Sequence, residues 1–90
     1  MNKIYKIHGL TICVSAPIKT LPFSVWRDVS RYAWSSSDLA GGPFGGYSIF
    51  NFATKDGVEG AAEVLKGAEF KEVTAPNWQE IIDAYYLDKG

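Results

Sequence analysis

The chain has 90 residues, a formal net charge of −1 and 47% apolar residues, which predicts one folded domain over residues 1–90 and excludes a disordered chain. The single cysteine, Cys13, excludes an intramolecular disulfide and a multi-cysteine zinc site, and it is typical of a reducing compartment. Neither a secretion signal nor an apolar run long enough to span a membrane is present, so we expect a cytoplasmic protein without membrane association.

Charge is distributed unevenly along the chain. Residues 1–51 carry five basic and two acidic side chains, whereas residues 52–90 carry four basic and eight acidic ones. Neither half has the dense group of lysines and arginines that anchors sequence-independent binding of nucleic acid. The acidic residues of the second half are also too widely spaced along the chain to imitate DNA. The charge pattern therefore does not select a polyanion or a polycation as the partner.

Residues 3–15 are rich in β-branched and aromatic side chains and predict extended structure with a break at Gly9. Two arrangements fit this segment. It is either one long bulged strand or a hairpin that turns at His8 and Gly9.

Residues 21–34 predict a helix, because Leu21, Val25 and Val29 recur at helical spacing. Trp26 and Trp34 add more apolar surface than this one stripe needs.

Residues 35–46 contain four glycines and a proline, and they predict a loop with Phe44 at its tip. A strand is expected at 47–52, with Tyr47 and Ile49 on one face and Phe50 on the other.

The second half of the chain predicts three further elements. A helix over 55–66 begins after Thr54, which is a suitable N-cap, and carries apolar residues at helical spacing. A short strand follows at 69–74, and a last helix at 78–88 starts with a sequence that resembles a capping box. The order of strands and helices predicts a small α+β domain, with an antiparallel sheet, two helices packed on it and a C-terminal helix.

No residue set for catalysis, cofactor binding or metal binding is visible. His8 and Cys13 are the residue types of a base and a nucleophile, but both arrangements of residues 3–15 separate their side chains. The acidic residues of the two later helices are typical of solvated helix faces, because they lack a calcium-binding loop pattern. We therefore expect a protein that is not an enzyme and that holds neither a cofactor nor a metal.

Two segments resemble the signature sequences of the RNA-recognition motif, the RNA-binding form of the ferredoxin-like βαββαβ sandwich. The segment Gly45-Gly46-Tyr47-Ser48-Ile49-Phe50-Asn51-Phe52 can be aligned with the octapeptide of that family, and Ile4-Tyr5-Lys6-Ile7 with its hexapeptide. Gly45 stands where the family has a basic residue, and Ile49 where it has a second stacking aromatic. Residues 35–42 are a poor match to the second strand of the family.

This resemblance implies a ferredoxin-like fold and, for function, binding of single-stranded RNA or DNA. Tyr5, Tyr47 and Ile49 would then lie on the open face of the sheet, where the two tyrosines would stack on unpaired bases.

Elimination favours a different function, which is binding to another protein. Thirteen aromatic residues are many for a domain of this size to bury, and exposed aromatics beside arginine are typical of interface centres. We expect Trp34, Phe44 and Tyr47 to be anchors, with Arg31 beside them. Small free-standing proteins of this kind resemble the inhibitors that phages and mobile elements use against host defence complexes, which would place the chain in the host cytoplasm. A homodimer through the sheet face is a further expectation.

Overall fold

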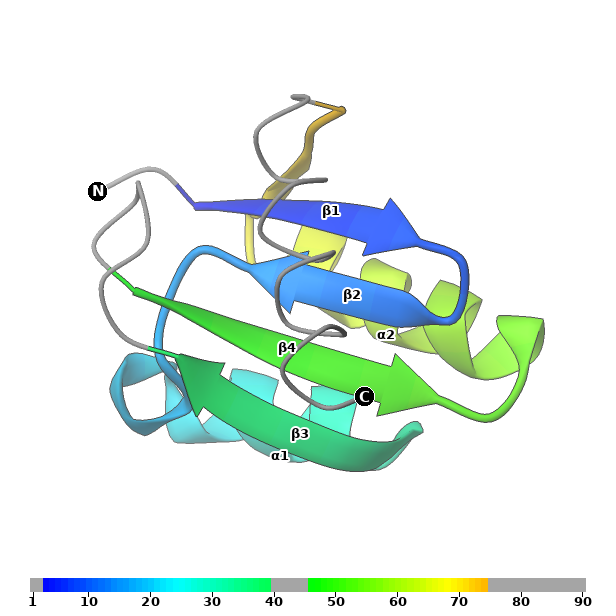
Figure 1. Cartoon of the computed structure of the whole chain (residues 1–90). Coiled ribbons are helices and arrows are strands. Elements are labelled where there is room, and N and C mark those ends of the chain that lie inside the picture. Colours follow the sequence, from blue (N-terminus) through cyan, green and yellow to red (C-terminus); the bar gives the residue numbers. More distant parts are fainter. Residues whose placement is uncertain (1–2, 40–45, 75–90) are drawn as a thin grey trace.

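The computed structural model describes residues 3–39 and 46–74. They form a five-stranded sheet with the order β3-β4-β2-β1-β5, and the two α-helices both lie behind this sheet in Figure 1. The predicted α+β class is confirmed, whereas the predicted helix at 78–88 and the loop tip with Phe44 lie outside the described residues. The elements are β1 (Ile4–His8), β2 (Thr11–Val14), a 3₁₀ turn (Ile18–Thr20), α1 (Phe23–Ser30), β3 (Ala33–Leu39), β4 (Tyr47–Phe52), α2 (Lys55–Gly67) and β5 (Lys71–Glu72).

Residues 3–15 form the hairpin, which was one of the two predicted arrangements. β1 pairs with β2 in an antiparallel register that places Tyr5 opposite Val14. Gly9 in the turn has a φ of 59°, a backbone conformation that residues with a Cβ rarely adopt.

The segment after α1 differs from the prediction. A helix over 21–34 and a loop over 35–46 were expected, but α1 ends at Ser30 and β3 begins at Ala33. β3 pairs with β4 along its whole length, with a bulge between Ala33 and Ser35. The Asn51 side chain on β4 donates a hydrogen bond of 3.0 Å to the Ser35 hydroxyl. The neighbouring strand therefore holds a serine-rich segment that has little strand propensity of its own.

The sheet is mixed, and the expectation of a wholly antiparallel sheet is wrong. β5 pairs with β1 in parallel, and it comprises two residues instead of the six expected at 69–74. The reason is the connection through α2, which returns the chain to the end of the sheet where β4 started, so that β5 runs in the direction of β4 and β1 (Figure 1). β1 lies between β2 and β5, which is not the strand order of a simple βαββαβ sandwich.

The main core lies between the helices and one face of the sheet, which we call the inner face. Strand register creates this face, because Ile12 on β2 is directly opposite Phe50 on β4. α1 contributes the predicted stripe of Val25 and Val29. α2 begins after Thr54, whose hydroxyl accepts a hydrogen bond of 3.2 Å from the Gly57 amide, as expected of an N-cap. The main side chains of this core are Tyr5, Ile12, Val14, Val25, Val29, Phe50, Phe52, Val58, Ala61, Ala62 and Leu65.

α2 also contacts Tyr32, in the turn between α1 and β3. A Cβ added at Gly60 would stand 2.5 Å from the Cε1 atom of Tyr32, which is far closer than van der Waals contact allows. The absence of a side chain at Gly60 therefore lets the Tyr32 ring lie against the helix.

We expect the effect of Gly60→Ala on stability to depend on whether the Tyr32 ring is present. In a Tyr32→Ala protein it should raise the free energy of unfolding by about 1 kcal/mol, the usual gain from replacing glycine inside a helix. In the wild-type background this gain should disappear or reverse, because the new methyl group displaces the Tyr32 ring. Urea denaturation followed by circular dichroism measures both effects.

Gly67→Ala is the matched control, since a Cβ there meets nothing within 4 Å. Its effect should be the same with Tyr32 present or absent. Equal effects of Gly60→Ala in the two backgrounds would show that the ring does not rest on this glycine.

Candidate functional site

Large aromatic side chains are exposed along α1 and at the start of β3. Phe23 is 68% exposed, Trp34 is 69% exposed, and Tyr32, between them in the chain, is 47% exposed. Residues of this size are usually buried in a small domain. Their exposure identifies α1 and the turn after it as a candidate for contact with another molecule.

The first part of this surface is a cluster around Phe23. The ring centroids of Phe23 and Trp26 are 6.0 Å apart in a tilted arrangement, and the Arg27 guanidinium carbon is 5.8 Å from the Phe23 centroid. These distances fit an aromatic pair and a cation–π contact. Trp26 packs partly against the core, but its buried indole nitrogen has no hydrogen-bond acceptor within the described part of the chain.

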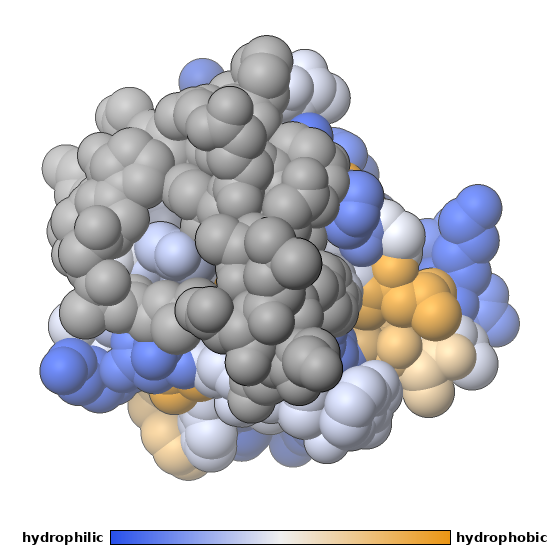
Figure 2. Space-filling view, in the orientation of Figure 1, coloured by the Kyte–Doolittle hydropathy of each residue, from blue (hydrophilic) through white to orange (hydrophobic). Residues whose placement is uncertain are grey.

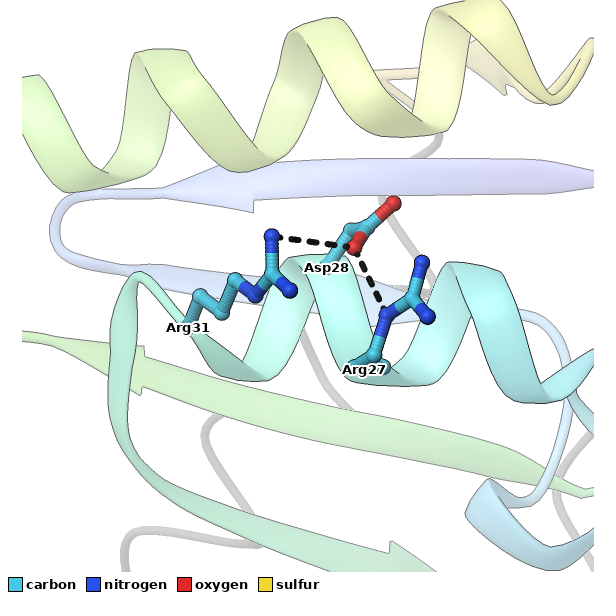
Figure 3. Close-up of polar contacts among 3 residues, drawn as sticks. All are labelled: Arg27, Asp28 and Arg31. Carbon is cyan, nitrogen blue, oxygen red and sulfur yellow. Dashed lines mark hydrogen bonds and ion pairs between the residues drawn. The ribbon is translucent and has the colours of Figure 1, made fainter.

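A pair of arginines continues the surface toward β3 (Figure 3). The Asp28 carboxylate accepts a hydrogen bond of 3.1 Å from Arg27 Nε, and its oxygen is 3.7 Å from Arg31 Nη1. Exposed ion pairs of this kind contribute little to stability. Their effect here is geometric, because one carboxylate holds two guanidinium groups along the same helix and leaves a net positive charge.

We call Phe23, Trp26, Arg27, Arg31 and Trp34 the aromatic–arginine surface. Side-chain contacts connect Phe23 through Arg27 and Asp28 to Arg31, and Trp34 follows three residues later in the chain. Apart from this surface and Tyr32, the exposed large hydrophobic side chain in the described ranges is Leu10, which is 44% exposed. It lies in the β1–β2 turn, at an end of the sheet where apolar residues also gather in Figure 2.

The structure separates the residues that we expected to act together as protein anchors. Arg31 and Trp34 are both exposed and close in the chain. Tyr47 is half-buried and pairs with Leu39, whereas Trp34 follows Ala33 at the opposite end of the β3–β4 ladder. At the usual rise per residue these ends are about 17 Å apart. The role of Phe44 stays a prediction, because it lies outside the described residues.

The residues implied by the resemblance to RNA-recognition motifs do not form a common stacking face. The Tyr5 ring is fully buried on the inner face, in contact with the core beneath the helices. Tyr47 and Ile49 lie on the other face of the sheet, and Ile49 is also fully buried. In addition, β2 lies between β1 and β4. Tyr5 therefore has no free ring surface on which a base could stack.

Sequence reasoning missed Phe23 and Arg27 as members of the surface. The signal was present, because the stripe of Leu21, Val25 and Val29 that packs into the core leaves Phe23 off the buried side. Sequence alone does not show that the Arg27 guanidinium lies over the Phe23 ring.

Cys13 does not have the properties of an activated nucleophile. Its side chain is fully buried, and this burial raises the pKa of the thiol to about 12, so the thiol is protonated at neutral pH. In the hairpin register Cys13 is opposite Lys6 and His8 is opposite Thr11, so the two residues are not cross-strand partners. Within residues 3–39 and 46–74, no group of three metal-ligating side chains occurs. No helix in these ranges is long and apolar enough to cross a membrane.

Comparisons of the chain with protein-family models, with curated proteins and with solved structures found no match. The candidate site is therefore inferred from the geometry of this chain alone.

Tyr5→Phe should raise the free energy of unfolding by about 1 kcal/mol. The Tyr5 hydroxyl is buried and has no hydrogen-bond partner in the described part of the chain, so its removal relieves a desolvation cost and keeps the ring packing. Burial, and then the Glu72 and Glu63 carboxylates, raise the pKa of this hydroxyl, which is the direction expected for a group without a stabilising donor. Urea denaturation measures the change, and Tyr32→Phe is a half-exposed control that should have no effect. A loss of stability in Tyr5→Phe would show that the hydroxyl has a partner.

Cys13 should not react with a thiol reagent such as DTNB at pH 8 in the folded protein, and it should react fully in urea. The folded thiol keeps its proton between pH 9 and about 12, where the unfolded thiol loses it. The free energy of unfolding should therefore fall as pH rises through this window, and Cys13→Ala should lack this part of the slope. Rapid labelling of the folded protein at pH 8 would contradict the burial of Cys13.

Proposed function

We propose that this chain is a small binding module that acts by contact with another protein through the aromatic–arginine surface. The observation that carries the proposal is the exposure of Phe23 and Trp34, at 68% and 69%, which come before and after, in the chain, an arginine pair held by one carboxylate. Each of these groups would lose water on contact with a complementary surface.

The residue types support a protein partner. Tryptophan and arginine are enriched among the residues that contribute most to protein interfaces, and aromatic rings supply a large contact area at a low cost in side-chain entropy. The net positive charge of Arg27, Asp28 and Arg31 favours a partner that presents a carboxylate beside an apolar patch. An inhibitor or an adaptor would use such a surface without chemistry of its own.

For the fold, we propose a ferredoxin-like domain with one additional strand. The segment from β2 to β5 follows the order βαββαβ, and β1 is the strand that comes before it and inserts between β2 and β5. This arrangement leaves the outer side of α1, with the exposed Phe23 and Arg27, open to solvent.

Phe23→Ala and Trp34→Ala should each weaken capture of the partner at least about tenfold, because each removes a large exposed ring from the contact. Their circular dichroism spectra and melting temperatures should stay close to those of the wild type, since neither ring is in the core. The measurement is an affinity pull-down from a lysate of the source cells, with and without nuclease, followed by titration of the captured protein against each variant.

Leu10→Ala is the matched control, because it removes an exposed apolar side chain from the β1–β2 turn, outside the proposed contact. It should bind as the wild type does. If both ring variants keep full affinity, the aromatic–arginine surface is not the contact. If nuclease abolishes capture, the partner is a nucleic acid and the proposal fails.

A further inference from the structure

A cavity of about 310 Å³ opens at the end of the sheet where β1 begins and β2 ends, at the left of Figure 1. Leu21 and Phe70, both buried, form its inner wall. Lys3, Thr20 and Pro22, which are exposed, form its rim, and Ser15 and Ala16 also line it. The cavity shares no residue with the aromatic–arginine surface.

Lys3 is the only charged residue among the described residues that line the cavity. Its nitrogen donates a hydrogen bond of 3.2 Å to the Ala68 carbonyl and lies 5.6 Å from the centre of the Phe70 ring. Neither contact is with a carboxylate, and an ammonium has three N–H groups to donate. Lys3 therefore brings to an apolar cavity a positive charge that no carboxylate in the described ranges neutralises.

The polar groups near Lys3 already have partners within the chain. The Thr20 hydroxyl donates to the Pro17 carbonyl at 2.9 Å, and the Ser15 hydroxyl accepts from the Ile4 amide at 3.0 Å. The cavity thus offers a ligand mainly apolar contact and one cationic anchor. This combination matches a molecule with an apolar body and a single negative charge.

We propose that this cavity binds a small apolar monocarboxylate, such as an arylalkanoate. The carboxylate would accept a hydrogen bond from Lys3, and the hydrocarbon part would lie against Leu21 and Phe70. The volume of about 310 Å³ is near the lower end of the range for ligand pockets, so a single ring with a short side chain fits and a long-chain lipid does not. This ligand is separate from the protein partner proposed above.

Titration of the ¹⁵N-labelled protein with 3-phenylpropanoate tests the proposal. Saturable shifts are expected at the amides of Ala16, Leu21 and Phe70. The uncharged 3-phenylpropanamide has nearly the same shape, and the cationic 3-phenylpropylamine has the opposite charge. We expect the amide to bind about tenfold more weakly than the acid, because it loses a charge-assisted hydrogen bond, and the amine not to saturate. Equal affinity for all three probes, or shifts that grow linearly with the acid, would overturn the proposal.

Two variants show whether binding occurs in this cavity. Lys3→Met keeps the length of the side chain and removes the charge, so it should reduce affinity for the acid about tenfold and leave the affinity for the amide unchanged. Thr20→Leu places a larger side chain at an exposed position on the rim of the cavity. It should narrow the opening and weaken the binding of both the acid and the amide. Lys55→Met, at the start of α2, removes an equivalent exposed charge elsewhere and should have no effect. Each variant is folded if its spectrum is unchanged at residues away from the cavity. If a folded Lys3→Met protein binds the acid with wild-type affinity, the proposed role of the ammonium is wrong.

Discussion

The packing of two amphipathic helices against a single face of the sheet is the constraint on which the rest of this structure depends. The β2–β4 register aligns Ile12 with Phe50, and this alignment gives α1 and α2 one apolar surface to cover. A slip of one residue would turn these side chains to the opposite face. The same register brings Thr11 opposite Asn51, where their side chains form a buried hydrogen bond of 3.1 Å.

The helix packing also explains which aromatic residues are left exposed. α1 is short, and Val25 and Val29 are its buried residues, so Phe23 cannot reach the core from its position on the helix. Tyr32 is confined between the end of α1 and Gly60 of α2, and Trp34 sits at the bulge of an edge strand. Bulges at sheet edges commonly redirect a side chain. The exposed rings are therefore a consequence of how the chain enters and leaves α1.

The core and the surface also differ in how their polar groups are satisfied. Outside regular helices and strands, backbone hydrogen bonds join distant segments, such as the 2.8 Å bond from the Phe52 amide to the Leu10 carbonyl. Among side chains in the described ranges, the buried polar atoms of Tyr5, Trp26 and Ser30 have no partner. Trp26 and Ser30 lie one turn apart on α1, and the Trp26 ring is next to the exposed Phe23. Two of the three unsatisfied groups in the described ranges are thus on α1, the helix that carries part of the surface proposed to bind a partner.

Local patterns in the sequence determined the elements whose own residues carry a strong signal. The alternation of residues 47–52 fixed β4 and the direction of Phe50, and the capping threonine and apolar spacing fixed α2. The burial of Tyr5 and the edge strand β3 were decided only by tertiary structure. Ser35, Ser36 and Ser37 have no alternating apolar pattern, and they are extended because β4 supplies partners for their backbone. Trp34 is exposed and Tyr5 is buried because of the face and the end of the sheet that each residue occupies. The position of each residue in the sheet depends on pairing with strands that are far away in the chain.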